Sequence, residues 1–234
     1  MEGPQAVREA LATTGLLELF TTDPEAELAE LAREAGTLVL HVTATVLAAL
    51  AETVTPQGLV GVAALLDVDL PTALAGHPRL VAVLHEVGDP GNAGTVVRTA
   101  DAAGADAVVL TAGSVDPHGG KCVRASAGSL WHLPVVSGTS LPDTVQALRT
   151  AGLQVLATTG AGEDDLDDLA DAGLLTAPTA WVFGAEAQGL SAEALAAADR
   201  RVRLPLRGRA ESLNVAAAAA VCLYATARAH RPLE

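Results

Sequence analysis

Residues 200–224 read R-R-V-R-L-P-L-R-G-R-A-E-S-L-N-V-A-A-A-A-A-V-C-L-Y, a basic run that leads through a loop into an alanine-rich segment. Pro205 and Gly208 interrupt the run, which predicts the loop. Ser212 and Asn214 are residue types that accept hydrogen bonds from the free N–H groups at a helix start. The alanines that follow predict a helix lying flat against another element, because alanine permits close packing. We interpret this loop-to-helix junction as a ligand site.

The length and composition limit which classes of protein this chain can belong to. The chain has 234 residues, half of them apolar, which is enough for a sizeable core. At about 100–200 residues per domain, this length predicts one large domain or two modest ones. No window reaches the ~18 apolar residues of a membrane span, and the N-terminal residues lack a signal pattern, so we expect a cytoplasmic protein. Two cysteines without Cys/His ligand spacing predict neither a disulfide framework nor a metal site.

The net charge of −14 argues at first against a nucleic-acid partner, because binding a polyanion requires Lys and Arg. The charge is unevenly distributed, however: residues 1–75 hold 2 basic and 11 acidic residues, whereas residues 76–234 hold 12 and 17. Screening limits electrostatic effects to about 8 Å at physiological salt, so local charge guides a ligand. The cluster Arg200, Arg201, Arg203, Arg207 and Arg209 is therefore either a basic site on an acidic body or a solvated face.

Strand-like and helix-like segments alternate in two blocks, which indicates an α/β fold. The first block has predicted strands at residues 16–20, 38–42 and 58–64 and predicted helices at 24–34 and 44–52. A stretch with two prolines and a glycine, residues 67–78, is a predicted linker. In the second block near-continuous apolar runs alternate with helical patterns, which predicts a parallel sheet covered on both faces. Its predicted strands are residues 80–85, 107–110, 135–136, 153–158, 180–183 and 202–204.

Three polar, glycine-containing turns follow strands of this second block, at the sheet edge where α/β proteins bind ligands. They are residues 92–100 (N-A-G-T-V-V-R-T-A), residues 183–190 (F-G-A-E-A-Q-G-L) and the loop-to-helix junction. Gly88, Gly91 and Gly94 do not have the G-x-G-x-x-G spacing, and no G-K-[ST] follows a glycine loop. Dehydrogenase and nucleotide-hydrolase functions therefore lose their main support.

Taken together, the three turns resemble the motifs of the SpoU (TrmH-like) branch of the SPOUT methyltransferases. The resemblance runs from Leu80 to about His230 and includes residues 121–128, K-C-V-R-A-S-A-G. It implies a deep trefoil knot, a homodimer and S-adenosyl-L-methionine-dependent methylation of a ribose 2′-hydroxyl in RNA, most simply rRNA. A tRNA methyltransferase and a catalytically idle RNA- or ribosome-binding relative remain alternatives. The 2′-hydroxyl also distinguishes RNA from DNA, so no DNA partner is expected.

The N-terminal block resembles the small ribosomal-protein-like substrate-binding domain of the family's rRNA members. The segments that carry this likeness are Glu2-Gly3-Pro4 and residues 53–58, T-V-T-P-Q-G. We therefore expect an N-terminal RNA-binding domain over residues 1–66, a linker over 67–78 and a knotted methyltransferase domain over 79–234. The first strand of the N-terminal domain is expected to be clipped, since only Met1 precedes Glu2.

The resemblance also assigns roles to residues. It implies cofactor binding, largely through backbone groups, by Thr158, Gly184, Leu204, Ser212 and Leu213. It implies a catalytic set of Asn92, Arg98, Glu186, Ser212 and Asn214, with Arg98 reaching towards the cofactor of the partner subunit.

The chemistry of these residues leaves several roles open. The family proposal makes Arg98 a base, but a guanidinium stays protonated in proteins. A cation that stabilises the developing alkoxide is chemically easier. Asn92 either positions Arg98 or caps its helix, and Ser212 and Asn214 face the chemistry, cap their helix, or do both. Candidate RNA phosphate contacts, each equally consistent with a surface salt bridge, are Lys121, Arg124, Ser126, Arg207 and Arg209.

Overall fold

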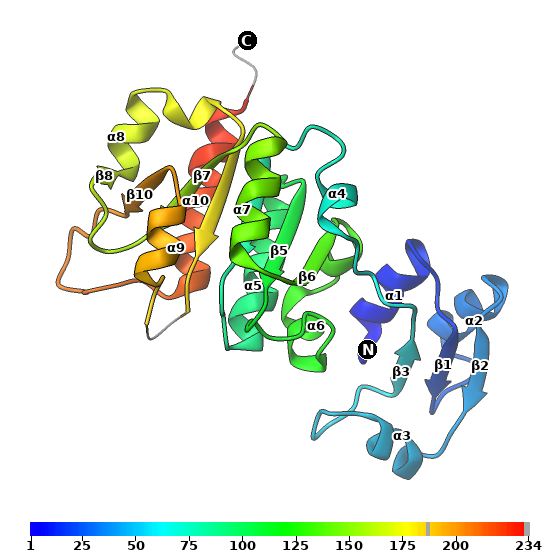
Figure 1. Cartoon of the computed structure of the whole chain (residues 1–234). Coiled ribbons are helices and arrows are strands. Elements are labelled where there is room, and N and C mark those ends of the chain that lie inside the picture. The colour runs from blue at the N-terminus through cyan, green and yellow to red at the C-terminus, as the bar shows by residue number, and fades with distance from the viewer. Residues whose placement is uncertain (186–187, 232–234) are drawn as a thin grey trace.

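The computed structural model describes residues 1–185 and 188–231 of the chain. A small N-terminal unit lies at one end of a larger C-terminal unit (Figure 1). The helices of the small unit are α1 (Pro4–Ala12), α2 (Glu27–Glu34) and α3 (Ala44–Leu50), and its strands are β1 (Glu18–Thr21), β2 (Leu38–His41) and β3 (Leu59–Val62). Strand β1 lies in the middle of this sheet, parallel to β2 and antiparallel to β3. The elements predicted for this unit are therefore confirmed, with ends that differ by a few residues.

The segment predicted as a linker is ordered against the C-terminal unit. Asp67 pairs with Val135 as an isolated parallel bridge, and Ser137 Oγ donates to Asp67 Oδ1 over 2.8 Å. A short helix, α4 (Leu70–Ala73), follows. Leu70, Ala73 and Leu74 are buried in the core of the C-terminal unit. The segment thus connects the two units and also packs on the larger one.

In the described part of the C-terminal unit, seven parallel strands form one sheet in the order β6-β5-β4-β9-β7-β10-β8. The strands are β4 (Leu80–Leu84), β5 (Ala107–Thr111), β6 (Val135–Thr139), β7 (Gln154–Thr158), β8 (Asp164–Asp165), β9 (Thr179–Phe183) and β10 (Arg200–Arg203). The helices are α5 (Pro90–Ala102), α6 (Gly120–Ser126), α7 (Leu141–Thr150), α8 (Leu166–Asp171), α9 (Ala192–Ala197) and α10 (Val215–Ala229). Two 3-10 turns, η1 (Ser129–Trp131) and η2 (Leu174–Thr176), complete it. The predicted parallel α/β sheet is confirmed.

Both faces of this sheet are buried, which explains its unbroken apolar strands. In β4, Leu80, Ala82 and Leu84 point into one core, shared with α5, α6 and α10. Val81 and Val83 point into the other core, shared with α4, α7 and α9. Figure 1 shows α7 and α9 on one side of the sheet and α10 on the other. Because successive strand residues face opposite sides, both sides of β4 must be apolar.

The alanine-rich helix α10 packs closely against other elements, as predicted, and these elements are β9 and α5. Trp181 of β9 is fully buried, and its Nε1 donates to Thr226 Oγ1 of α10 over 2.9 Å. This bond satisfies an indole N–H that would otherwise be costly to bury. Cys122 and Cys222 are both buried, and burial raises the pKa of the Cys122 thiol to about 12. None of the described helices is long and apolar enough to cross a membrane.

Charged side chains join the N-terminal unit to the C-terminal unit. Glu2 is buried and forms an ion pair with Arg124 of α6. His132, just after η1, pairs through Nδ1 with Asp101 at 2.7 Å and through Nε2 with Glu9 of α1 at 3.3 Å. The hydrogen bonds to Asp101 and Glu9 raise the pKa of His132. The N-terminal unit is therefore docked on α6 and η1 by specific polar contacts.

Candidate active site

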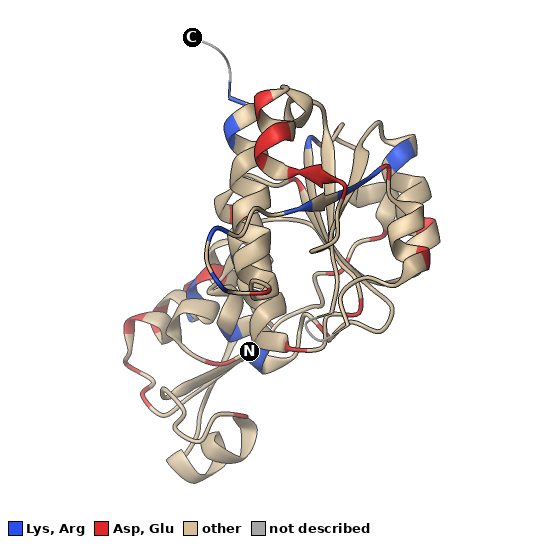
Figure 2. Ribbon diagram, turned by 90° about the vertical axis from the view of Figure 1, so that its left-hand side faces the viewer, with Lys and Arg blue, Asp and Glu red and all other residues tan. Residues whose placement is uncertain are grey.

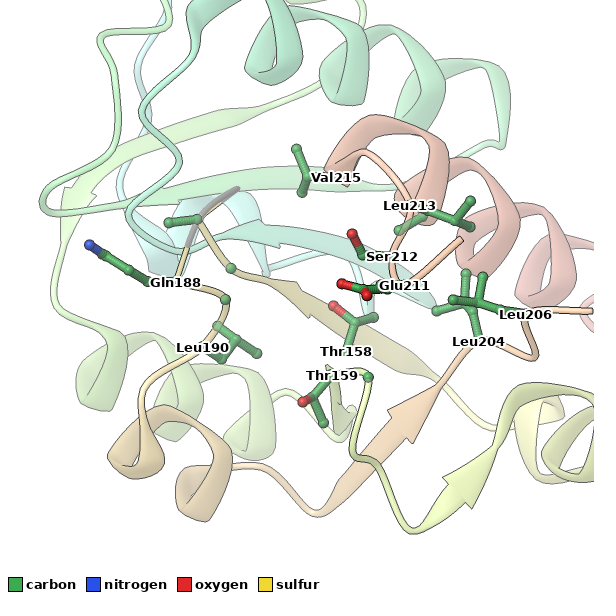
Figure 3. Close-up of a pocket in the computed structure, with 15 residues that line it drawn as sticks. Thr158, Thr159, Gln188, Leu190, Leu204, Leu206, Glu211, Ser212, Leu213 and Val215 are labelled. Atoms are coloured by element: carbon green, nitrogen blue, oxygen red, sulfur yellow. The ribbon is translucent and has the colours of Figure 1, made fainter. Parts of the chain in front are cut away.

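A cavity of about 230 Å³ opens at the carboxyl ends of β7, β9 and β10, where three loops meet (Figure 3). This is the edge at which parallel α/β sheets bind ligands. Its described lining residues are Thr158, Thr159, Gly160, Gly184, Ala185, Gln188, Gly189, Leu190, Leu204, Leu206, Glu211, Ser212, Leu213, Val215 and Ala218.

All of the residues predicted to hold a cofactor lie in this one cavity: Thr158, Gly184, Leu204, Ser212 and Leu213. They follow three different strands, and the sheet order, in which β9, β7 and β10 are neighbours, gathers them. Thr158, at the end of β7, is oriented by the neighbouring strand β9, because its Oγ1 donates to the carbonyl oxygen of Val182 over 3.1 Å. The structure therefore gives these residues a common location, and their contacts with a cofactor stay a prediction.

Gly184 is required by the turn that follows β9. A Cβ at this position would lie 2.5 Å from the carbonyl carbon of Gly189 and 2.7 Å from the backbone nitrogen of Leu190. The same turn is closed by a backbone hydrogen bond from Gly189 to Ala185 of 2.9 Å. A side chain at position 184 would thus push apart two backbone segments that both line the cavity, a close approach that glycine alone permits.

The start of α10 is held by Asn214, whose side chain has two functions. Its Oδ1 caps the helix by accepting hydrogen bonds from the backbone nitrogens of Ala216, at 2.9 Å, and Ala217, at 3.4 Å. Its Nδ2 donates to Oδ1 of Asn92 over 3.0 Å. The predicted cap at Asn214 is confirmed, and the same residue joins two of the three motifs.

Asn92 lies in the first turn of α5, and its own helix is capped by another residue. Asp89 Oδ1 accepts from the backbone nitrogen of Asn92 over 2.8 Å, and Asp89 Oδ2 pairs with Lys121 Nζ at 2.7 Å. The hydrogen bond from Lys121 is the largest cause that lowers the pKa of Asp89. The interpretation of Asn92 as the helix cap is therefore wrong. Lys121 is engaged within the chain rather than displayed alone.

Arg98 lies on α5, beyond the first turn that contains Asn92, and its side chain is exposed. Its side chain forms no hydrogen bond or ion pair with another described residue, and Arg98 is not among the described residues that line the cavity. The structure thus brings Asn92, Ser212 and Asn214 to the site in one chain but does not place Arg98 in the same chain's cavity. Glu186, the remaining predicted catalytic residue, lies outside the described residues.

The arginine cluster is paired with the acidic stretch that precedes and enters α8. Four ion pairs connect them: Arg200–Asp164 at 3.3 Å, Arg201–Glu163 at 2.9 Å, Arg203–Asp165 at 3.3 Å and Arg207–Asp167 at 3.0 Å. Figure 2 shows the blue strand β10 beside the red acidic segment. The hydrogen bonds from Arg201 hold the pKa of Glu163 below its usual range. We call these four pairs the ion-pair ladder.

Most of the side chains predicted to contact RNA are already engaged by the ion-pair ladder or by other contacts within the chain. Arg124 is paired with Glu2, and Arg207 with Asp167. Ser126 is fully buried and donates its hydroxyl to the carbonyl of Val123 over 2.8 Å. Arg209 is exposed and has no hydrogen bond or ion pair with another described residue. RNA contact by any of these residues stays a prediction, and the geometry favours Arg209.

Two residues near the site were missed in the sequence. Glu211 lines the cavity, directly before Ser212, and its adjacency to the motif was the available signal. Asp89 caps α5, and the Asp-Pro pair at the start of that helix is typical of a cap followed by proline in the first turn.

Comparison with known proteins relates both units to RNA methyltransferases. Residues 79–224 match the SpoU rRNA Methylase family, and residues 1–67 match the family described as RNA 2′-O ribose methyltransferase substrate binding. A similar curated protein is the 23S rRNA (guanosine(2553)-2′-O)-methyltransferase RlmP of Bacillus subtilis (strain 168). The two sequences are 37% identical over 228 residues, which cover 96% of this chain and 86% of that protein.

Two solved structures share the whole arrangement. An AdoMet-bound rRNA methyltransferase from Sinorhizobium meliloti has a TM-score of 0.81 and 32% identity, covering 97% of this chain and 86% of that one. The SpoU methyltransferase AviRb from Streptomyces viridochromogenes, in complex with the cofactor AdoMet, has a TM-score of 0.84 and 29% identity, covering 97% of this chain and 88% of that one.

Proposed function

Because the chain belongs to the SpoU rRNA methylase family, we propose that it transfers a methyl group from S-adenosylmethionine to a ribose 2′-hydroxyl of ribosomal RNA. The observation that carries this proposal is the cavity at the ends of β7, β9 and β10, beside which Asn214 bonds to Asn92. The motif residues Gly184, Leu204, Ser212 and Leu213 line this concave, partly apolar cavity, as expected of a ligand site.

The lining suits S-adenosylmethionine, which supplies an activated methyl group on a positively charged sulfur. Leu204, Leu206 and Leu213 offer apolar surface to the adenosine or the methionine chain. The turns at Gly160 and Gly184 bring backbone groups to the cavity wall, where they are available as hydrogen-bond partners. We propose that these backbone groups, more than charged side chains, hold the cofactor.

For the transfer step, the ribose hydroxyl must lose its proton as the oxygen–carbon bond forms. We assign to Arg98 the stabilisation of the developing alkoxide, because a fixed cation performs that task without changing its own protonation. Asn92 and Asn214, held together at 3.0 Å, would order the surface on which the ribose lies. Glu186 remains a proposed orienting residue from the family motif.

A homodimer would bring Arg98 to a cavity. In one chain Arg98 is exposed, outside the cavity, on α5, which packs against α10. Helix α10 also exposes Val221 and Tyr224, with relative exposures of 46% and 53%. We propose that a second copy covers this face and that each Arg98 serves the partner's cavity.

We propose that the N-terminal unit and Arg209 contact the RNA, with Lys121, Arg124 and Arg207 able to do so only if their ion pairs open. We propose that the chain is knotted, as its resemblance to the family implies. A cytoplasmic location follows from the proposed substrate.

The test is direct. Purified protein would be incubated with transcribed 23S rRNA and methyl-labelled S-adenosylmethionine, and 2′-O-methylation would be mapped by resistance to alkaline hydrolysis. A single labelled ribose supports the proposal. Labelling of transcribed tRNA but not rRNA favours the tRNA alternative, and RNA binding without any transfer favours the idle relative. Absence of heat on titration with S-adenosylmethionine would reject the enzyme altogether.

A further inference from the structure

The cavity contains one charged group that the motif does not assign. Among the described lining residues, Glu211 is the only ionisable one. Figure 3 shows its carboxylate pointing into the cavity, between the side chains of Ser212 and Thr158. In the described part of the chain it makes no hydrogen bond or ion pair. A carboxylate is therefore presented to whatever the cavity holds.

Among the described residues no arginine forms an ion pair with Glu211, and Arg203 and Arg207 are engaged elsewhere. Arg203 and Arg207, which flank the start of the same loop, are paired with Asp165 and Asp167 at 3.3 and 3.0 Å. The ion-pair ladder thus engages these guanidinium groups with carboxylates other than that of Glu211. In a chain of net charge −14, a carboxylate inside a ligand cavity adds to a negative potential that favours a cationic ligand.

We propose that Glu211 makes the cavity select the positively charged cofactor over its neutral product. The inference rests on the proposed function. In the transfer, the bond from sulfur to the methyl carbon breaks and the bond from the ribose oxygen to that carbon forms. Sulfur keeps the electron pair, and the hydroxyl proton leaves to solvent. The bound molecule thereby changes from a sulfonium to a neutral thioether, S-adenosylhomocysteine.

Glu211 therefore has an attractive partner before the transfer and loses it afterwards. The charge on the sulfur disappears, whereas the amino-acid group and the adenosine are common to cofactor and product. An interaction with the sulfonium charge raises affinity for the cofactor alone, which limits inhibition by the product. Since only differential affinity separates two ligands, the quantity to measure is the ratio of the two dissociation constants.

The test compares Glu211→Gln with the unaltered protein by calorimetric titration of S-adenosylmethionine and of S-adenosylhomocysteine. We expect Glu211→Gln to weaken binding of the cofactor about three- to tenfold, where tenfold corresponds to about 1.4 kcal/mol, and to change binding of the product little. Glu211→Asp keeps the charge and should keep most of the ratio. Added salt should shrink the difference, because the group is exposed to solvent.

A matched control variant and a third ligand distinguish the effect of the Glu211 charge on the sulfonium from other effects of the substitution. Glu193→Gln removes the same charge from an exposed glutamate of α9 that does not line the cavity, and it should leave the ratio unchanged. Sinefungin, which carries an amine near the position of the sulfonium methyl, should follow the cofactor. Equal weakening of cofactor and product in Glu211→Gln, with unfolding unchanged, would overturn the proposal and assign Glu211 to the adenosine or the amino-acid group. Absence of binding by the unaltered protein would instead reject the proposed function.

Discussion

Asn214 donates a hydrogen bond of 3.0 Å from Nδ2 to Oδ1 of Asn92, a residue 122 positions earlier in the chain. The same Asn214 side chain caps α10 through its oxygen. The Asn214 amide therefore uses its oxygen to cap a helix and its nitrogen to form a contact between distant motifs. Asparagine supplies this combination because it carries an acceptor and a donor on one short side chain.

Substitutions at Asn214 should separate the two functions. Asn214→Ser keeps a capping oxygen but loses the amide donor, whereas Asn214→Ala loses both. We expect Asn214→Ala to lower the free energy of unfolding by about 0.5–2 kcal/mol more than Asn214→Ser, the usual value of a cap. Both should impair methyl transfer. Chemical denaturation and a transfer assay would check this, and equal stability of the two variants would contradict the capping role.

Arg98→Ala should lose methyl transfer without losing the cofactor. Removal of a group that stabilises a developing oxyanion typically costs about 10²–10³ in rate. Because Arg98 has no hydrogen bond or ion pair among the described residues, its removal should leave the unfolding midpoint unchanged. Single-turnover kinetics with saturating cofactor provide the measurement, and an undiminished rate would remove Arg98 from the mechanism.

The proposed partner contribution can be tested with the same variant. Arg98→Ala supplies an intact cavity but no arginine, whereas Gly184→Ala supplies the arginine but a disturbed cavity. Refolding the two variants together should restore part of the activity if each Arg98 serves the partner subunit. No recovery from the mixture, with dimers present by light scattering, would mean that the arginine acts within its own chain.

Gly184→Ala should weaken cofactor binding by spreading the turn after β9. The added Cβ would lie 2.5 Å from the backbone of Gly189, closer than side chains are found. Gly76→Ala is the matched control, since Gly76 does not line the cavity and an added Cβ there would have no heavy atom within 4 Å. Calorimetry should show loss of affinity for the first variant only. Retained affinity in Gly184→Ala would show that the turn can relax at little cost.

The contact of His132 with Asp101 and Glu9 predicts pH-dependent stability. These hydrogen bonds raise the pKa of His132 above its ordinary value of 6.5 in the folded chain. The contribution of protonated His132 to the free energy of unfolding is therefore fully present below pH 6.5. It is lost as pH rises through the folded-state pKa of His132. Denaturation of the unaltered protein and of His132→Asn across this range should give curves that converge at higher pH. His77→Asn, at an exposed histidine, should show no such convergence.

Local sequence patterns were sufficient for much of the fold. The apolar runs predicted the buried parallel strands, because a strand covered on both faces has no polar side. The family resemblance, rather than any local pattern, predicted that Gly184, Leu204 and Leu213 share a site, and they line one cavity. Segment ends were less accurate: the strand predicted at residues 16–20 is β1, Glu18–Thr21.

Partners between distant charges could not be read from the sequence. The pairing of Arg201 with Glu163 depends on β10 lying beside β8, which is a property of the sheet order. Likewise Arg124 has its partner, Glu2, at the other end of the chain. Position in three dimensions decides both of these cases. The cap of α5 differs from them, because the Asp89-Pro90 pair at the helix start is itself a local signal for a cap at Asp89.

The contacts of Glu2 with Arg124 and of Glu9 with His132 have a consequence for substrate choice. They hold the N-terminal unit at a set offset from the cavity of its own chain. If RNA contacts both the N-terminal unit and the cavity, this offset selects the substrate. A folded RNA then fits only when its binding element and its reactive ribose are separated by the same distance. An unstructured strand that contains the target nucleotide would be a poor substrate. Recognition would depend on the fold of the RNA as much as on its nucleotide sequence.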